Sequence, residues 1–248
     1  MKEIKLPSNK EFLNNFILQR TGAFLELGGG VPFGHWQQTG QKDQLADFLH
    51  QNKLTQPFLQ KTLSAMYKEM VDVIKTFDLK NRKLTHMVSI GPGNGLLEYF
   101  LIEELNKSLS DNNVKSLTLI DVEETETHEH MFKEKGSGYA SLNSTKQFLE
   151  MNELEIEVEL INPQKQSLPT IDFQICLSFL SMGFHYPCDE YELFLTSANQ
   201  GALLIFDKRR GVIDKGFENV SKAYKVVGTL DNGKADRLGL EKYSVGTD

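Results

Sequence analysis

The chain has 248 residues, 40% of them hydrophobic and 25% charged, which suffices for the core of one large domain or two small ones. That composition excludes a disordered or fibrous protein. The 34 acidic and 27 basic side chains give a net charge of −7, so there is no overall positive field to hold a polyanion. We therefore expect no nucleic-acid partner.

The cysteines and the apolar runs exclude two further classes of protein. Cys176 and Cys188 form no CxxC pair and are too few for a disulfide framework, so we expect reduced thiols. The N-terminal residues alternate in charge and lack the apolar run of a signal peptide, and the longest apolar stretches are strand-sized. The sequence thus predicts a cytoplasmic protein without membrane insertion, either a monomer or a homodimer.

The first third of the chain has a helical pattern. Apolar side chains recur every three or four residues over 9–26, 45–49 and 58–74. Gly28, Gly29 and Gly30 are expected to end the first helix, and a loop over 31–40 is expected to follow them. Residues 1–84 are therefore predicted to form a helical N-terminal cap or lid region.

After Thr85 short apolar runs alternate with amphipathic stretches, which is typical of βα units and a parallel sheet. The expected strands are 87–90, 117–120, 156–161, 173–177 and 203–206, and the expected helices are 96–105, 145–151 and 190–197. The segments 223–230 and 237–243 flank Asp-Asn-Gly at 231–233, a strong hairpin signal. Residues 85–248 are thus predicted to form an α/β domain, with a Rossmann-like, doubly wound, mostly parallel seven-stranded sheet that ends in an antiparallel hairpin.

A glycine-rich turn follows the first predicted strand. Gly91, Gly93 and Gly95 alternate with Pro92 and Asn94, and a helix is predicted directly after them. Such a turn lets a ligand approach the backbone at the carboxyl edge of a sheet. A dinucleotide fingerprint would need a sixth-position glycine where this chain has leucine, and the GK[ST] of a P-loop is missing from the sequence here. A tight βα turn without a ligand is the alternative.

An acidic residue, Asp121, ends the second predicted strand, where a carboxylate can accept hydrogen bonds from both hydroxyls of a ribose. The glycine turn, this acid and the terminal hairpin together resemble the class I S-adenosylmethionine-dependent methyltransferases over 85–248. The resemblance implies S-adenosyl-L-methionine as the cofactor and a methyl group as the transferred group. The cofactor-binding residues that it implies are Gly91, Pro92, Gly93, Asn94, Gly95, Asp121, Val122, Asn162, Gln164, Ser178 and Phe179.

The segment Gly183-Phe184-His185-Tyr186-Pro187 follows the fourth predicted strand. It resembles a stretch of the sugar O-methyltransferases assigned to bacterial capsule and lipopolysaccharide gene clusters. This resemblance implies a small polar acceptor, a nucleotide-linked sugar of surface polysaccharide biosynthesis, and it places His185 and Tyr186 beside the transferred methyl group. Another capsule building block, such as a phosphoramidate or phosphate ester, fits the residues equally. A non-catalytic, Rossmann-like nucleotide-binding module is the third interpretation.

Methyl transfer to an alcohol calls for a base, because a hydroxyl is a poor nucleophile until its proton leaves. Histidine titrates near neutrality, and His185 and His35 are the two candidates, with Tyr186 as the third catalytic candidate. Metal-dependent O-methyltransferases use carboxylates around the fourth strand, whereas the first acids after this strand are Asp189 and Glu190. We therefore predict a mechanism without a metal.

Two other segments each allow two interpretations, and a pair of histidines is assigned no role. The segment 28–38 combines glycines, polar side chains and Trp36, which suits either a lid that orders over ligands or an ordinary helix connector. The Lys-Arg-Arg cluster at 208–210 suits either the phosphates of a nucleotide-linked sugar or a solvated surface. His128 and His130 are two residues apart, do not share a helix face, and are assigned no role.

Overall fold

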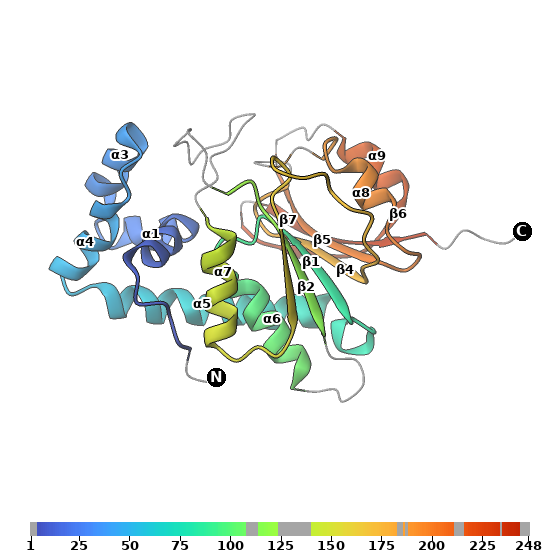
Figure 1. Cartoon of the computed structure of the whole chain (residues 1–248), viewed down its shortest axis with the longest axis horizontal. Helices are drawn as coiled ribbons and strands as arrows, with labels where there is room; N and C mark the ends of the chain where they lie inside the picture. Colours follow the sequence, from blue (N-terminus) through green and yellow to red (C-terminus); the bar gives the residue numbers. More distant parts are fainter. Residues whose placement is uncertain are drawn as a thin grey trace, which may run out of the picture.

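The computed structural model describes residues 4–107, 114–123, 140–182, 186, 188–210, 216–233 and 235–243. Over these residues one seven-stranded sheet forms the centre of the molecule (Figure 1). The strands are β1 His86–Ile90, β2 Ser116–Ile120, β3 Glu157–Ile161, β4 Ile175–Ser178, β5 Leu203–Arg209, β6 Tyr224–Asp231 and β7 Ala235–Lys242. Their order is β3-β2-β1-β4-β5-β7-β6, in which β1 to β5 are parallel and β7 pairs antiparallel with both β5 and β6. This topology confirms the predicted fold class.

Helices lie on both faces of the sheet, and α1, α3 and α4 lie to one side of it (Figure 1). Those before the sheet are α1 Lys10–Gln19, α2 Thr21–Glu26, α3 Gly30–Thr39, α4 Asp43–Gln51, α5 Thr55–Thr76 and the 3₁₀ turn η1 Leu79–Asn81. Those after β1 are α6 Leu96–Asn106, α7 Leu142–Met151, α8 Glu192–Thr196 and α9 Phe217–Lys222. Within the described ranges, none of these helices is both long enough and apolar enough to cross a membrane.

The central strands are buried on both faces. Along β1, Met87 belongs to the apolar cluster that α5 and α6 share, whereas its neighbour Val88 belongs to the cluster on the side of α8. This alternation follows from the two-residue period of a strand. Edge strand β3 instead alternates exposed and half-buried residues. The sheet thus separates two apolar layers, as doubly wound folds do.

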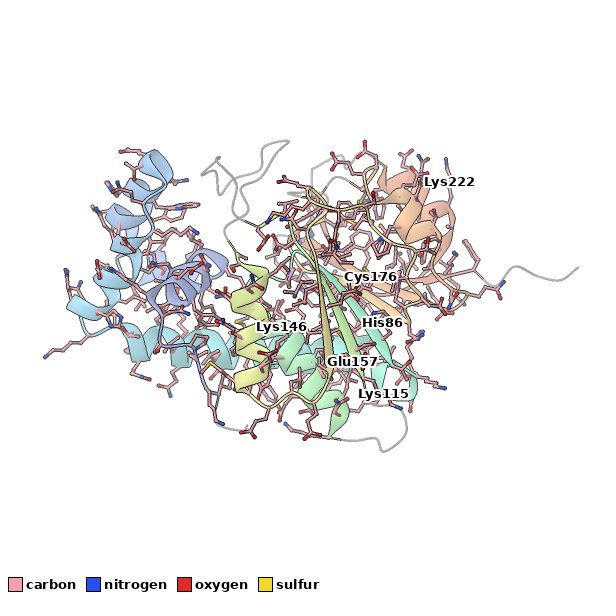
Figure 2. All side chains as sticks on the ribbon, in the orientation of Figure 1. His86, Lys115, Lys146, Glu157, Cys176 and Lys222 are labelled. Atoms are coloured by element: carbon pink, nitrogen blue, oxygen red, sulfur yellow. The ribbon has the colours of Figure 1, made fainter. Side chains whose placement is uncertain are left out.

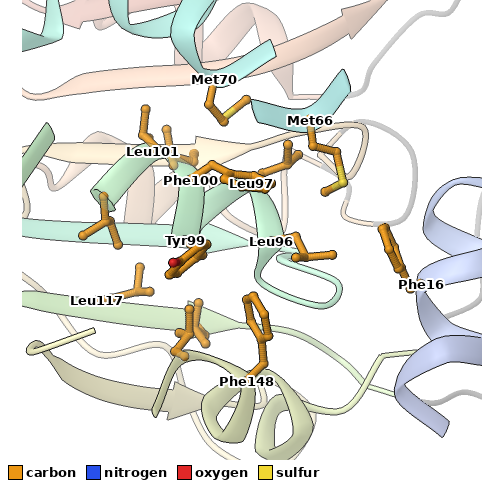
Figure 3. Close-up of a cluster of buried hydrophobic side chains, with 14 of the residues drawn as sticks. Phe16, Met66, Met70, Leu96, Leu97, Tyr99, Phe100, Leu101, Leu117 and Phe148 are labelled. Atoms are coloured by element: carbon orange, nitrogen blue, oxygen red, sulfur yellow. The ribbon is translucent and has the colours of Figure 1, made fainter. Parts of the chain in front are cut away.

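The N-terminal helices share an apolar core with the sheet. Phe16 of α1 and Met66 and Met70 of α5 lie in one buried cluster with Leu97 and Phe100 of α6 (Figure 3). Full burial of a side chain of this size stabilises the fold by about 1.5 to 3 kcal/mol. The helices before β1 therefore pack as a cap on the sheet, and their division from it at residue 84 stays a prediction.

One predicted loop is a helix. Residues 31–40 lie almost entirely in α3, which begins at Gly30 and ends where Gly40 adopts a left-handed φ of +75°. Pro32 stands in the first turn, where a proline removes no intrahelical hydrogen bond. The glycines and the proline suggested a connector, but buried Pro32 and Trp36 anchor the segment as a helix against its neighbours. The loop predicted over 31–40 is therefore wrong.

The two edges of the parallel strands differ in the residues that they carry. His86, Lys115 and Glu157 stand at the amino ends of β1, β2 and β3 (Figure 2). The glycine turn and Asp121 follow the carboxyl ends of β1 and β2. The predicted site residues therefore gather on the opposite edge of the sheet.

Candidate functional site

The candidate site lies at the carboxyl edge of the parallel strands. The ends of β1, β2 and β3 are in register at Ile90, Ile120 and Ile161. Past these ends, the Gly91 N–H donates to the Ile120 carbonyl at 2.8 Å and the Asp121 N–H donates to the Ile161 carbonyl at 3.1 Å. Open α/β sheets bind ligands at this edge.

The glycine turn is closely packed on both sides. Gly91 has a φ of +70°, and a Cβ placed on it would lie 2.4 Å from Ser181 Oγ. Gly93 has a φ of +60°, and its Cβ would lie 2.8 Å from Gln19 Nε2. The left-handed backbone requires glycine at both positions, and at Gly91 the missing space requires it as well. The turn therefore brings its backbone within reach of α1 and of the segment after β4.

Polar side chains fix the turn between α1 and α7. Asn94 is buried, and its Nδ2 donates to the Phe12 carbonyl of α1 at 3.1 Å. Thr145 of α7 donates its hydroxyl to the Gly93 carbonyl at 2.7 Å. The side chain of Asn94, predicted to contact a cofactor, thus also ties the turn to the cap.

Asp121 is a buried carboxylate with two hydrogen-bond donors. Its Oδ1 accepts the Glu123 N–H at 2.7 Å, and the Tyr186 hydroxyl is hydrogen-bonded to the carboxylate. The same hydroxyl oxygen accepts the Val122 N–H at 3.3 Å. The segment after β4 therefore reaches back across the sheet edge to the end of β2.

The ionisation of Asp121 and Tyr186 follows from this burial. Loss of solvation raises the pKa of Asp121 to about 6, although the Glu123 N–H and the Tyr186 hydroxyl counteract part of the shift. Burial, and then the charge of Asp121, raise the pKa of Tyr186 well above its ordinary value. At neutral pH Asp121 is thus a carboxylate and Tyr186 a proton donor to it. A catalytic part for Tyr186 remains a prediction.

Asn162 and Gln164, which were predicted to bind the cofactor, lie in one polar corner. Asn162 Nδ2 donates to Glu123 Oε2 at 2.9 Å and to the Val122 carbonyl at 3.4 Å, while its Oδ1 accepts the Gln164 N–H at 2.9 Å. Lys165 pairs with Glu123 at 3.0 Å. Glu123 was not among the predicted residues, although its place two residues after Asp121 was a usable signal.

A cavity of about 700 Å³ adjoins this corner. Its walls come from the end of β2, the segment after β3 and α8. The lining residues are Val122, Pro163, Gln164, Leu168, Pro169, Thr170, Glu190, Tyr191, Leu193, Phe194 and Ser197. A mostly apolar cavity with a few polar groups suits a flat, weakly polar ring such as a purine.

The two residues predicted at the end of β4 have different contacts. Ser178 is buried, donates to the Ile90 carbonyl at 3.0 Å and accepts the Met182 N–H at 2.9 Å. Phe179 lies against the guanidinium of Arg237, which is 4.1 Å from the ring centroid. Ser178 therefore ties β4 to β1, and Phe179 lies on the side of β7.

Of the candidate bases, the structure places His35 away from the sheet edge. His35 lies on α3, which packs against α2 and α4 and stands apart from the sheet (Figure 1). Its Nε2 is 3.2 Å from Gln41 Oε1. Outside the described residues lie His185 with Gly183, Phe184 and Pro187, and also His128 and His130. The assignment of His185 as the base stays a prediction from the sequence.

Glu98 is a buried acid that the sequence analysis missed. It lies on the first turns of α6, is 2% exposed, and accepts the Ser89 hydroxyl at 2.6 Å through Oε1. Its Oε2 has no hydrogen-bond partner among the described residues. Burial raises its pKa to about 7, against the opposing effects of Ser89 and of the positive charge of Arg20; the charge of Glu69 adds to the rise.

This acid predicts a pH-dependent stability. With the ordinary pKa near 4.5 raised to about 7, the folded state binds the proton more tightly, so the unfolding free energy falls as pH rises from 4.5 through 7. Between pH 5 and pH 8 the expected loss from this group is about 2 to 3 kcal/mol. In urea unfolding, a Glu98→Gln variant should gain that amount relative to the unmodified protein over this interval. Parallel pH curves for the two proteins would contradict this assignment.

A chain of alternating charges runs from α1 to β5. Arg20, which directly follows α1, pairs with Glu69 of α5 at 3.4 Å, and Glu69 pairs with Arg237 of β7 at 2.8 Å. Arg237 holds Asp207 of β5 through Nε at 2.7 Å and Nη2 at 2.8 Å, and Asp207 also accepts the Leu180 N–H at 3.0 Å. The network thus connects the cap to the carboxyl ends of β4 and β5.

The basic cluster at 208–210 lies at the end of β5 and is partly neutralised. Lys208 Nζ lies 4.7 Å from the centroid of the Phe217 ring. Arg210 pairs with Asp231 at 3.0 Å and also with Asp236 on the hairpin. These contacts favour the solvated-surface interpretation of the cluster over a phosphate site.

A metal site would require several ligating side chains in one place. Over the ranges that the structure describes, no three His, Cys, Asp or Glu side chains are grouped to hold a metal ion. The two cysteines are both buried, and burial raises the pKa of the Cys176 thiol above its ordinary range. A mechanism without a metal remains a prediction.

Neither a family model nor a curated protein sequence matches this chain. A crystal structure from Listeria monocytogenes, provisionally named a class I S-adenosylmethionine-dependent methyltransferase, superposes with a TM-score of 0.50 and 14% identity over 97% of this chain and 90% of that one. Magnesium protoporphyrin IX methyltransferase from Synechocystis PCC 6803, with bound cofactor, gives a TM-score of 0.44 and 13% identity over 75% and 79% of the two chains. At these identities the first similarity establishes the fold: the chain is built like class I methyltransferases.

Proposed function

We propose that this protein transfers a methyl group from S-adenosyl-L-methionine to a hydroxyl of a small polar acceptor. The proposal rests on one observation. The glycine turn, Asp121 and the cavity beside Val122 lie together at the carboxyl edge of the sheet, in a protein with the methyltransferase fold. A tight turn alone requires neither a buried carboxylate nor an adjoining cavity. Their coincidence favours a bound nucleoside.

The described residues fit this cofactor. Asp121 is ionised at neutral pH and can accept hydrogen bonds from two ribose hydroxyls. The cavity along Val122 and Gln164 suits the adenine ring, and the glycine turn admits the backbone to close contact. When bound, the cofactor supplies an electrophilic methyl group on a sulfonium. The chain has to orient the acceptor in line with that methyl group and exclude water.

The acceptor is proposed to be a sugar, in particular a nucleotide-linked sugar of surface polysaccharide synthesis. The support is the resemblance of the segment 183–187 to sugar O-methyltransferases. Phe179 and Leu180 stand between β4 and this segment and contact Arg237 and Asp207, which are fully buried and paired with each other. These two charged groups therefore support the end of β4 and do not bear on the choice of acceptor.

Asp121→Ala is expected to weaken binding of S-adenosylmethionine and S-adenosylhomocysteine by roughly 2 to 4 kcal/mol, because two charge-assisted hydrogen bonds to the ribose are lost. Titration calorimetry with both ligands and with NAD measures the effect, and the unmodified protein should bind the first two in preference to NAD. Asp43→Ala, on exposed α4, is the matched control and should bind like the unmodified protein.

Three results would count against the proposal. Preference for NAD would point to a dinucleotide protein, and unchanged affinity in Asp121→Ala would remove the ribose from this carboxylate. Binding without any release of S-adenosylhomocysteine on a panel of nucleotide-linked sugars and phosphate esters would favour a non-catalytic binding module.

A further inference from the structure

A second cavity, of about 340 Å³, lies at the amino edge of the sheet, opposite the candidate site. Three turns line it: residues 82–84 before β1, residues 173–174 before β4 and residues 199–202 before β5. His86, the first residue of β1, marks this edge in Figure 2. Because β1 is five residues long, roughly 15 Å separate the two edges. The cavity is therefore distinct from the site proposed for the cofactor.

The wall of this cavity carries an excess of positive charge. Arg82 and Lys83 both line it, and the described lining residues include no Asp or Glu. Arg82 Nη2 pairs with Glu241 at 2.8 Å, but Glu241 also pairs with Lys225 at 3.0 Å, so two cations share one acid. Lys83 is exposed and forms no ion pair within the described ranges. An anion in the cavity would therefore meet at least one uncompensated positive charge.

Two lining residues have hydrogen-bond donors without partners. Gln174 Oε1 accepts the Thr85 hydroxyl at 2.9 Å and the His86 N–H at 2.7 Å, which fixes the amide and leaves Nε2 unpaired among the described residues. Leu84 is 2% exposed, yet its N–H donates to no residue that the structure describes. Buried N–H groups are nearly always paired, with water or a ligand where the chain offers no acceptor. Two of the three turns thus offer donors to an added acceptor.

We propose that this cavity binds a small phosphorylated sugar. Arg82 and Lys83 hold the phosphate, and the Gln174 amide donates to it. Asn199 and Gln200, exposed on the third turn, have amides that both donate to and accept from sugar hydroxyls. The volume is at the lower end of the range for small-molecule sites, which suits one sugar ring with its phosphate.

A phosphate matches this wall better than a carboxylate does. Near neutral pH a phosphate ester carries almost two negative charges on three accepting oxygens, whereas a carboxylate carries one charge on two. Adjacent arginine and lysine side chains with further N–H donors therefore satisfy more of a phosphate.

A purely structural interpretation is the alternative, in which Arg82 ties its turn to β7 through Glu241 and Lys83 is merely solvated. That interpretation predicts no affinity for a sugar phosphate. It also gives Lys83 and Gln174 no effect on the binding of any ligand. Variants of these two residues therefore separate the interpretations.

The test is titration calorimetry with glucose 1-phosphate, inorganic phosphate and glucose. The unmodified protein should bind glucose 1-phosphate more tightly than inorganic phosphate, and glucose only weakly. Lys83→Gln should weaken glucose 1-phosphate about 10-fold, because a charge-assisted hydrogen bond is lost. Gln174→Glu should weaken it about 10- to 100-fold, since it keeps the acceptor for Thr85 and His86 but places a negative charge beside the phosphate.

Matched controls locate the binding. Lys75→Gln, on an exposed position of α5, should leave glucose 1-phosphate affinity unchanged, and so should Asp121→Ala. Lys83→Gln and Gln174→Glu should keep S-adenosylhomocysteine affinity within about twofold of the unmodified protein, because that ligand belongs to the other edge. Lys83→Gln changes only an exposed side chain, so it serves if Gln174→Glu fails to fold.

Three outcomes would overturn the proposal. The first is the absence of glucose 1-phosphate binding to the unmodified protein. The second is binding that neither Lys83→Gln nor Gln174→Glu weakens, which would place the sugar phosphate elsewhere, such as in the acceptor site. The third is equal affinity for inorganic phosphate and glucose 1-phosphate, which would show that the sugar makes no contact.

Discussion

Arg237→Met is expected to lower the unfolding free energy by about 3 to 5 kcal/mol, because it leaves the buried carboxylate of Asp207 without a counter-charge. Arg237 is entirely buried and also pairs with Glu69 of α5. Methionine fills most of the volume of arginine, so the loss reports the charge and not a cavity. Urea unfolding at pH 7, followed by far-UV circular dichroism and by the fluorescence of the sole tryptophan, Trp36, measures it.

Two further variants separate the charge from the packing. Asp207→Asn combined with Arg237→Met removes both buried charges, so the double variant should be more stable than Arg237→Met alone. Arg210→Met removes an exposed partner of Asp231 and Asp236 and should leave the stability almost unchanged. A loss below about 1 kcal/mol in Arg237→Met would show that water or another group solvates Asp207.

The strands of the sheet were predictable because burial on both faces produces continuous apolar runs. β1, β2 and β4 each begin within two residues of the apolar runs at 87–90, 117–120 and 173–177. The Asp-Asn-Gly turn correctly indicated the hairpin of β6 and β7. Residues that directly follow strands, such as Asp121, could be placed at the sheet edge from the parallel topology alone.

The contacts of the cap could not be predicted in this way. Helical periodicity shows that α1 has an apolar face, but it does not say which part of the sheet the face covers. Gln19 therefore looked like an ordinary polar residue near a helix end, although it lies on the glycine turn. The loop predicted over 31–40 is instead helix α3, because glycine and proline suggest loops even where buried side chains stabilise a helix.

The buried charges were hidden for a related reason. Glu98 follows a run of apolar residues in α6, and a charged residue in a helix is usually a solvated one. Arg237 lies among charged and apolar residues of β7, where a strand with one solvated face is the ordinary interpretation. The position of α5 beside this strand, with Glu69 on it, converts that face into an interior.

The remaining candidate base is His185. His35 is paired with Gln41 on α3, and the Tyr186 hydroxyl is hydrogen-bonded to Asp121, so the two described candidates already have other partners. We therefore expect His185→Ala and His185→Asn to lower turnover by about 10²- to 10⁴-fold, the usual contribution of a general base, with cofactor affinity unchanged. Release of S-adenosylhomocysteine, measured on the nucleotide-linked sugar that gives the fastest turnover, reports the effect.

The controls follow from the contacts of the other two candidates. His35→Ala should retain nearly full turnover, and Tyr186→Phe should weaken cofactor binding through Asp121 more than it lowers turnover. The rate with the unmodified protein should fall at acid pH as the histidine protonates, and EDTA should not change it. A larger loss in His35→Ala would move the base to the cap, and normal turnover in both histidine variants would assign proton removal to a carboxylate or to solvent. Inactivation by EDTA that Mg²⁺ reverses would contradict the metal-free mechanism whichever histidine mattered, because a metal ion would then lower the pKa of the acceptor hydroxyl in place of a base.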